Sequence, residues 1–305
     1  MGQIDLMKKK LLIIGGASLI GSTLINEFKN NYDIHLTYNK TPVNSNFSQT
    51  KLNLLDDRNQ ISSVITNLNP DVVVNTVAYP NVDFCETHHD EANLLHVSIT
   101  DDLVSVCSDI SSPLVYFSTD AVFDGTKSIK YTEDDKTSPL SYYGKTKLEA
   151  EKIILKINEN IVLRTTVVYD WHIRSRFTNW VLKNLKQGSK ITAFTDQSNT
   201  ATLAGDISHS LFCLLDKNHS GLFHCAGKTC LSRYDFAIKL ADYFGYDKKL
   251  IIPTISKNTQ SASRPENGCL DSSKLEGLTN FCLSDIDQGI TSMLNSSKTI
   301  PDIFL

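Results

Sequence analysis

The sequence lacks a long apolar run, and this absence excludes a membrane-spanning helix from its expected features. The apolar stretch near the N-terminus covers only residues 11–14, and no other stretch approaches the roughly 18 residues that a bilayer requires. The segment before it does not have the long apolar core of a signal peptide. We therefore expect a cytoplasmic protein with no membrane partner.

The sequence also has little excess charge and no cysteine pair at metal-binding spacing. Thirty Lys and Arg stand against 34 Asp and Glu, and the only basic triplet is residues 8–10, so nucleic acid is not an expected partner. The seven cysteines include no C-x-x-C pair, and Cys225 and Cys230 have no further ligands nearby in sequence. We expect free, mostly buried thiols and no bound metal.

An alternation of strand-like and helix-like segments occupies the first half of the chain. Residues 10–14 are almost all apolar, which is typical of a strand covered on both faces, and residues 19–28 have apolar residues at helical spacing. This alternation predicts a doubly wound parallel α/β sheet of the Rossmann type, with a smaller α/β region after about residue 170. Further strands are expected at residues 34–38, 71–75, 113–118 and 161–164, and long helices at 94–107 and 142–155.

A glycine-rich turn follows the first expected strand and opens the first helix. Gly15 suits a tight turn and Gly21 lets the helix approach the sheet, while Ser18 replaces the middle glycine of a dinucleotide-binding fingerprint. The Ser18 side chain would either crowd a phosphate or donate a hydrogen bond to it. The alternative is an incidental glycine turn. Under the fingerprint hypothesis, the phosphate contacts are these residues together with Leu19 and Ile20.

Tyr143 and Lys147 lie four residues apart in the long helix and therefore share one face. A tyrosine with a pKa near 10 exchanges protons poorly at neutral pH, but a nearby ammonium and a cationic nicotinamide ring lower that pKa. Thr119 follows a buried strand, where a hydroxyl can hydrogen-bond both a ketone and Tyr143. Each feature alone fits an ordinary helix or strand end, but their order and spacing together predict a catalytic site.

These motifs resemble the extended short-chain dehydrogenase/reductase family, and within it the dTDP-4-dehydrorhamnose reductase branch. The likeness runs through nearly the whole chain, including STDAVFDG at residues 118–125, YGKTKLEAE at 143–151 and an R-P-x-N-x-x-L-D pattern at 264–271. It implies that a hydride moves from NADPH to the 4-keto carbon of a nucleotide-linked deoxy sugar. Tyr143 would then protonate the alkoxide, Lys147 would tune Tyr143 and bind the ribose, and Thr119 would orient the ketone.

The resemblance also implies further contacts with cofactor and substrate. Ala78 and Tyr79 would line the cofactor cleft, and Arg264 would face the nucleotide diphosphate unless it is an ordinary surface arginine. The second strand ends without an acid and is followed by Lys40, which favours NADPH over NADH unless Lys40 is simply a loop residue. The remaining expected cofactor contacts are Asn39 and Asn53. The remaining expected substrate contacts are Asp120, Ala121 and Val167.

Some residues depart from the pattern of this branch. His96 stands where an Asn is usual, and Ala121 and Val167 stand where aromatic residues are common. Two missing aromatics would leave more room around the sugar, so we expect a different or bulkier 4-keto sugar nucleotide. A dehydratase or epimerase is disfavoured because Asp120 is followed by Ala121 and not by the Glu of dehydratases.

Two organisational questions stay open at this point. The chain is also similar to the β subunit of methionine adenosyltransferase, a regulatory subunit that binds NADP, so a non-catalytic role is the alternative. We expect residues 1–166 to form the NADP-binding domain and residues 167–305 to form the substrate-binding region, either separate or interleaved. The expected partners are a nucleotide-sugar substrate and, as an open alternative, a second copy of the chain.

Overall fold

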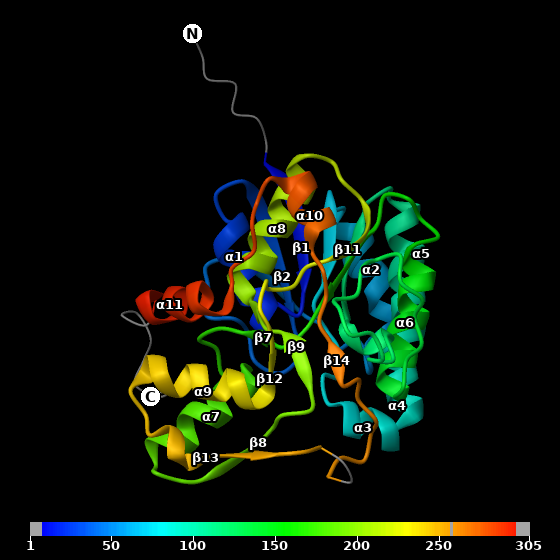
Figure 1. Cartoon of the computed structure of the whole chain (residues 1–305). Coiled ribbons are helices and arrows are strands. Elements are labelled where there is room, and N and C mark those ends of the chain that lie inside the picture. The colour runs from blue at the N-terminus through cyan, green and yellow to red at the C-terminus, as the bar shows by residue number, and fades with distance from the viewer. Residues whose placement is uncertain (1–7, 257–258, 297–305) are drawn as a thin grey trace.

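A seven-stranded parallel sheet forms the centre of the computed structural model, which describes residues 8–256 and 259–296 (Figure 1). Its strands are β1 (Lys9–Ile14), β2 (Tyr32–Tyr38), β3 (Ser48–Lys51), β4 (Val72–Asn75), β5 (Leu114–Thr119), β6 (Ile161–Thr165) and β11 (Gly221–His224). The order across the sheet is β11-β6-β5-β4-β1-β2-β3. The strand order therefore reverses between β1 and β4, as in a doubly wound sheet, and the predicted Rossmann fold is confirmed.

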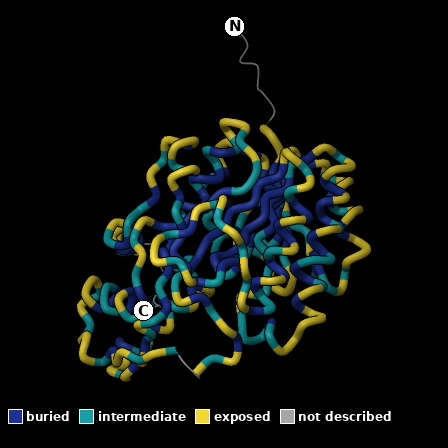
Figure 2. Tube along the Cα trace, turned by 45° about the vertical axis from the view of Figure 1, so that its right-hand side comes forward, coloured by how far each residue is buried: buried dark blue, intermediate teal, exposed yellow. Residues whose placement is uncertain are grey.

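Helices cover both faces of this sheet. The unbroken apolar run of β1 serves both sides, because Leu11 and Ile13 pack into one core and Leu12 and Ile14 into the other. Figure 2 shows the resulting band of buried strands through the middle of the molecule. One core is covered by α1 (Leu19–Phe28) and α8 (Ala204–Asp216). The other is covered by α2 (Ile61–Leu68), α5 (Ile99–Asp109) and α6 (Tyr142–Ile154).

The strands expected in the first half are present to within two residues at each end. Some neighbouring elements were not predicted, because their sequences have no clear apolar period. Strand β3 is a short polar edge strand. The helix expected at 94–107 is a longer helical stretch composed of α4 (His89–Asn93), a π-helical turn (Leu94–Ser98) and α5. Before it lies the short helix α3 (Val82–Thr87).

A smaller α/β region follows β6, as the sequence predicts, and has its own apolar core. Its helices are α7 (Arg176–Lys186), α9 (Arg233–Phe244) and α11 (Ile286–Ser296). Helix α10 (Ser273–Thr279) packs against α8 and β11 in the core of the large sheet. The short strands of the smaller region are β7 (Val168–Tyr169), β8 (Ile191–Phe194), β9 (Ser198–Thr200), β10 (Thr202–Leu203), β12 (Cys230–Ser232), β13 (Ile251–Thr254) and β14 (Asn267–Gly268). Between them α8 and β11 return to the large sheet, so the division at residue 166 stays a prediction. The outer ends of the two proposed domains, at residues 1–7 and 297–305, lie outside the described residues.

A disulfide bond joins Cys230 to Cys269, so the prediction of free thiols is wrong for this pair. Strands β12 and β14 both pair with β9, and this pairing brings together two cysteines that are 39 residues apart in sequence. No short sequence spacing could reveal such a pair. The other five cysteines are free, and three of these are buried.

Replacing Cys230 by serine should lower the free energy of unfolding by about 2–4 kcal/mol, because a cross-link over a loop of this length restricts the unfolded chain. Urea unfolding in the absence of reductant measures the change. The control is Cys282→Ser, which removes an exposed free thiol. The prediction fails if dithiothreitol leaves the urea midpoint of the unsubstituted protein where it was.

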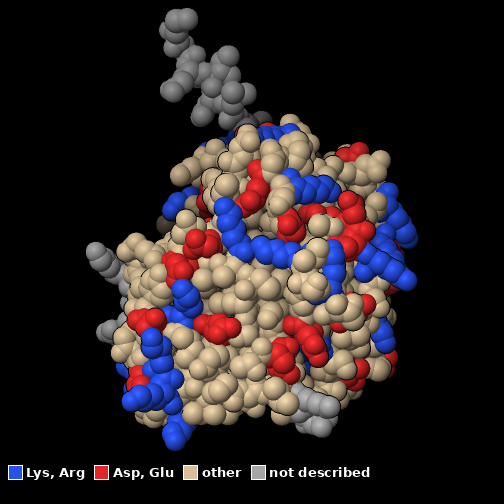
Figure 3. All heavy atoms as spheres, in the orientation of Figure 1, with Lys and Arg blue, Asp and Glu red and all other residues tan. Residues whose placement is uncertain are grey.

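Helix length, metal-ligating side chains and surface charge bear on whether the described residues could contact a membrane, a metal ion or a charged partner. No helix in residues 8–256 and 259–296 is both long and apolar enough to cross a membrane. The same ranges contain no group of three or more His, Cys, Asp and Glu side chains placed to hold a metal ion. On the face shown in Figure 3, acidic side chains lie among the basic ones.

Candidate functional site

The turn after β1 has the shape that the glycine motif predicts. Gly15 has a φ of +84°, and a Cβ built on it would lie 2.6 Å from Val77 Cγ2. A Cβ on Gly21 would lie 2.6 Å from the carbonyl oxygen of Gly15. Any larger residue would therefore move either the turn or α1. The turn and the start of α1 form an open cradle beside the point where the strand order reverses.

Ser18 holds this cradle together with its own hydroxyl group. Its Oγ accepts a hydrogen bond from Gly21 N at 2.9 Å and donates one to Thr76 Oγ1 at 2.8 Å. The hydroxyl is thus engaged within the protein, and the expectation that it could donate to a phosphate is not met by this arrangement. The N–H groups of Leu19 and Ile20, at the first turn of α1, have no acceptor among the described residues. An anion at this helix end would meet both donors, so the residues present fit a dinucleotide diphosphate.

The other expected cofactor residues lie along the neighbouring strand ends. Ala78 and Tyr79 are half-buried in the loop after β4, and Asn39 and Lys40 are exposed directly after β2. Asn53 organises its own turn, where its Oδ1 accepts from Leu55 N at 3.2 Å. All five residues follow the carboxyl ends of β2, β3 and β4, the edge at which ligands bind in such sheets.

The predicted catalytic residues meet where β5 ends beside the start of α6. Ser141 caps α6 by accepting a hydrogen bond from Gly144 N at 3.2 Å, and Glu86 Oε2 accepts one from Tyr142 N at 2.8 Å. These two contacts fix the first turn of α6, which carries Tyr143. Thr119 is buried at the end of β5, and its hydroxyl donates to Asp120 Oδ1 at 3.1 Å.

Gly144 lets α6 approach the loop after β5 closely. A Cβ on this residue would lie 2.2 Å from the carbonyl oxygen of Ala121, so only glycine fits without displacing the helix. The close approach places Ala121 beside the first turn of α6. Asp120, its neighbour, is buried and accepts a hydrogen bond from Asn199 Nδ2 at 2.6 Å. Burial raises the pKa of the Asp120 carboxyl, against which its hydrogen bonds to threonine and asparagine side chains act.

Lys147 is almost fully buried one turn after Tyr143. Its Nζ donates to the carbonyl oxygen of Phe117 at 2.6 Å and lies 3.9 Å from the centre of the Tyr116 ring. Burial lowers the pKa of Lys147 to about 7, while the carboxylate of Glu151 acts in the opposite direction. Lysine at this position therefore gains and loses a proton near neutral pH.

Burial raises the pKa of Tyr143 well above 10, and the Thr119 hydroxyl offsets only part of the rise. Among this chain's own residues the net shift of the Tyr143 pKa is therefore upward, and the expected lowering by Lys147 together with a nicotinamide ring stays a prediction. Desolvation of the phenolate outweighs the effect of an ammonium that is directed to Phe117 and has a low pKa itself. Tyr143 is held as a neutral phenol, which is the form that can give a proton.

His96, noted in the sequence only as a departure from its branch, joins the cofactor loop to the catalytic helix. Its Nε2 accepts from Tyr79 N at 3.0 Å, so Nδ1 carries the proton and donates to Thr146 Oγ1 at 2.9 Å. Thr146 in turn donates to the carbonyl oxygen of Tyr143 at 2.9 Å. The π-helical turn that carries His96 is a long-range packing feature with no signal in the local sequence.

Acid should destabilise the protein through His96. Burial, assisted by Lys147, lowers the pKa of His96 to about 3 from an ordinary value of 6.5. Between these values the unfolded chain binds the additional proton, so the free energy of unfolding should fall by about 1.4 kcal/mol for each unit of falling pH from this group alone. The difference in urea unfolding between the unsubstituted protein and His96→Asn, from pH 7 to pH 4, isolates the effect. Exposed His89→Asn is the control, and parallel curves for all three proteins would contradict the expectation.

Arg264 is engaged by an acid from the first half of the chain. Its guanidinium forms two hydrogen bonds with the carboxylate of Asp83 in α3, at 2.6 and 3.3 Å, and donates a third to the carbonyl oxygen of Ala262 at 3.0 Å. The Arg264 guanidinium, with contributions from Ala262 N–H and the Ser261 hydroxyl, holds the pKa of Asp83 far below its usual range. This ion pair ties the segment before β14 to α3, and the structure does not bring Arg264 into contact with the catalytic residues.

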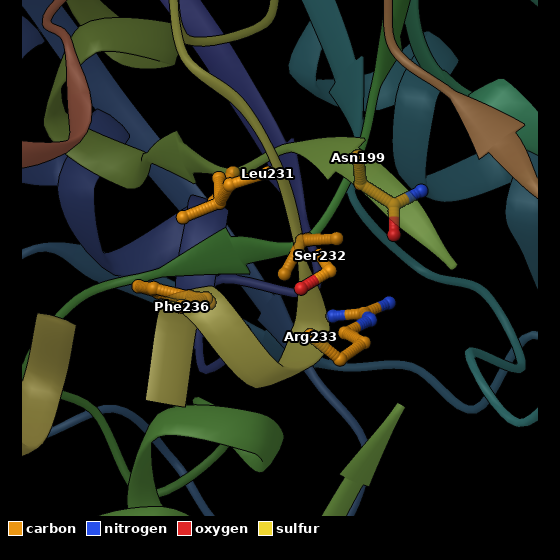
Figure 4. A pocket seen from close by; sticks show the side chains of 7 residues that line it. Asn199, Leu231, Ser232, Arg233 and Phe236 are labelled. Carbon is orange, nitrogen blue, oxygen red and sulfur yellow. The ribbon is translucent and has the colours of Figure 1, made fainter. Parts of the chain in front are cut away.

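Val167 and the start of α9 line a small hollow. Figure 4 shows Asn199, Ser232 and Arg233 around it. Val167 has a φ of +45°, which is rare for a β-branched residue and stores backbone strain. Asn199, which holds Asp120, lines the same hollow, and so does Arg233 at the start of α9. Neither Asn199 nor Arg233 is predictable as a site residue from a single sequence, because each reaches the site only through the fold of the second region.

Comparisons with known proteins agree with this geometry. A family model described as the RmlD substrate binding domain matches residues 8–299. The chain is 33% identical over 229 residues to a probable low-salt glycan biosynthesis reductase, Agl14, of Haloferax volcanii, covering 73% of this chain and 76% of that protein. It is 31% identical over 287 residues to methionine adenosyltransferase 2 subunit beta of Bos taurus, covering 90% and 84%.

A solved structure shares the fold over almost the whole chain. The dTDP-4-dehydrorhamnose reductase of Bacillus anthracis, in complex with NADP, superposes with a TM-score of 0.86 at 22% identity, covering 95% of this chain and all of that one. At this level of identity the superposition establishes the common architecture.

Proposed function

The chain belongs to the RmlD substrate binding domain family, and from this membership we propose that it reduces the 4-keto group of a nucleotide-linked deoxy sugar with NADPH. The family comprises NAD(P)-dependent reductases of sugar nucleotides. One observation carries the proposal: the Thr119 hydroxyl meets the Tyr143 phenol at the ligand-binding edge of the sheet, and the buried Lys147 follows one turn later on the same helix.

Each of these residues has a defined task in a ketone reduction. NADPH, when bound, supplies a hydride to the ketone carbon. Tyr143 holds a proton at its phenol oxygen for the oxygen atom that becomes an alkoxide, and the burial that raises its pKa keeps this proton in place until then. Lys147 is held by the carbonyl of Phe117 and stabilises the phenolate once the proton has left. Thr119 is placed to orient the ketone by exchanging its hydrogen bond to Asp120 for one to the ketone oxygen, while Asn199 continues to hold the Asp120 carboxylate.

The cofactor residues fit a nicotinamide dinucleotide, and one of them favours NADPH over NADH. The turn at Gly15 and the free N–H groups of Leu19 and Ile20 fit the diphosphate that NADPH and NADH share. Lys40 is exposed after β2, with no acid at that strand end to hold a ribose hydroxyl, and so favours the additional phosphate of NADPH.

The test is a spectrophotometric assay of cofactor oxidation with an enzymatically prepared dTDP-4-keto-6-deoxy sugar. We expect turnover that depends on the sugar nucleotide and is faster with NADPH than with NADH. Related 4-keto sugar nucleotides with larger substituents belong in the same assay, because Ala121 and Val167 are smaller than the aromatic residues expected at these positions. A preference for dTDP-4-dehydrorhamnose over every relative tested would contradict the proposal of a bulkier substrate.

A second candidate function is a non-catalytic regulatory subunit that binds NADP. The likeness to methionine adenosyltransferase 2 subunit beta extends over 90% of this chain and supports this alternative. The two functions differ in a simple experiment. NADPH binding without turnover of any 4-keto sugar nucleotide, together with co-purification of a transferase from the host cell, would favour the regulatory role.

A further inference from the structure

Arg233 lies at the N-terminus of α9, where several contacts hold its backbone and side chain. It is the first residue of that helix, and its backbone N–H donates to the carbonyl oxygen of Gln197 at 3.1 Å. The preceding Ser232 caps the helix by accepting a hydrogen bond from Asp235 N at 3.0 Å. The guanidinium carbon lies 5.2 Å from the centre of the Phe177 ring, which supports the side chain on one side.

The guanidinium of Arg233 has no hydrogen bond or salt bridge within residues 8–256 and 259–296. In Figure 4 it points into the same space as the side-chain amide of Asn199. Arg264 differs in this respect, because the Asp83 carboxylate accepts hydrogen bonds from both terminal nitrogens of its guanidinium. The N–H donors of this half-buried guanidinium are therefore left for solvent or for an anionic ligand.

The charges around Arg233 are compatible with the binding of an anion. Burial lowers the pKa of Arg233 to about 10, the carboxyl of Asp120 acts against the shift, and the cation of Arg264 adds to it. Arg233 is therefore still charged at neutral pH. Asp120 is already hydrogen-bonded by Thr119 and Asn199 and does not form an ion pair with it. A positively charged side chain at the N-terminus of a 12-residue helix adds to the favourable field for an anion.

We propose that Arg233 binds the diphosphate of the nucleotide-linked substrate, and that it does so beside an Arg264 already oriented by Asp83. This inference rests on the proposed function, since it takes a nucleotide sugar as the ligand. The hollow that Arg233 lines also contains Val167 and lies next to Asp120, both predicted substrate contacts. A planar guanidinium with free N–H donors matches the paired oxygens of a diphosphate better than the neutral hydroxyls of a sugar.

Calorimetric titration of the NADP-loaded chain tests this role without any need for turnover. The probes are dTDP, UDP and GDP, each compared with its nucleoside, thymidine, uridine or guanosine. Arg233→Gln should weaken binding of the best nucleoside diphosphate about tenfold to a hundredfold and leave binding of its nucleoside unchanged. Arg233→Lys keeps the positive charge but not the planar guanidinium. Its affinity for the nucleoside diphosphate should lie between that of Arg233→Gln and that of the unsubstituted protein.

The control is Arg58→Gln, which removes the same charge from an exposed pair with Asp102 and should bind all probes normally. Unchanged diphosphate affinity in Arg233→Gln overturns the inference. An equal loss of affinity for the nucleoside and its diphosphate also overturns it, and so does an unsubstituted protein that binds none of the three diphosphates. Arginine-dependent diphosphate binding without any ketone reduction would support the inference while contradicting the proposed reductase. Ketone reduction with full diphosphate affinity in Arg233→Gln would do the reverse.

Discussion

Tyr143→Phe is expected to lower kcat for NADPH-linked ketone reduction by about 10²–10⁴-fold while leaving NADPH affinity unchanged. The substitution removes one hydroxyl group, and this hydroxyl is the proton donor in the proposed reaction. The phenyl ring stays in place because α6 is fixed by Ser141 and Glu86 and not by the phenol. Steady-state kinetics and a fluorescence titration of NADPH measure the two quantities separately.

The neighbouring residue provides a matched control for this result. Tyr142 stacks on His89 with ring centres 3.8 Å apart, and Tyr142→Phe removes the same atoms one position away. This control should retain kcat within about twofold, because no step of the proposed reaction uses that hydroxyl. Equal losses in both variants would mean that the first turn of α6 had been disturbed, and would remove Tyr143 from its proposed role.

Lys147→Met is expected to abolish most of the turnover and yet to raise the free energy of unfolding by about 2–4 kcal/mol in the cofactor-free protein. Folding moves the ammonium from water into the interior and lowers its pKa from 10.5 to about 7. Burying the ammonium therefore costs free energy of folding. Methionine has similar length and no charge, so the variant does not carry this cost. The lost hydrogen bond to Phe117 reduces the gain by about 1 kcal/mol.

The stabilisation by Lys147→Met has a definite dependence on pH. Between pH 7 and 10.5 the unfolded chain binds a proton on Lys147 that the folded protein does not bind, so the cost is complete below about pH 7 and vanishes as pH rises toward 10.5. The stability difference between variant and unsubstituted protein should therefore shrink between pH 7 and 9.5 in urea unfolding. Lys145→Met, at an exposed position of the same helix, should show no such trend. A variant less stable than the unsubstituted protein at pH 7 would contradict the buried-charge argument.

Local sequence patterns were sufficient for the parts of the structure that depend on neighbouring residues. The turn at Gly15 and the shared face of Tyr143 and Lys147 both follow from spacings of six residues or fewer. The parallel sheet follows from apolar runs that need cover on both faces, and so five of its seven strands (β1, β2, β4, β5 and β6) are predicted to within two residues.

Features that depend on distant residues were out of reach of the same reasoning. His96 meets Tyr79 and Thr146 only through the packing of the π-helical turn against α6. The disulfide of Cys230 depends on the pairing of β9 with two strands from different parts of the chain. The pKa of Tyr143 depends on how completely the fold buries its phenol, which a spacing of four residues does not reveal.

The left-handed backbone of Val167 has a consequence for how this chain evolves. A β-branched residue at a φ of +45° costs about 1–3 kcal/mol, and glycine or asparagine would relieve most of that cost. Stability therefore disfavours valine at this position, and a contribution of its side chain to the hollow that it lines would oppose that pressure. In a lineage whose members had become regulatory subunits, this contribution would disappear while the cost remained. In such a lineage we therefore expect valine at position 167 to be among the first residues replaced, by glycine or asparagine.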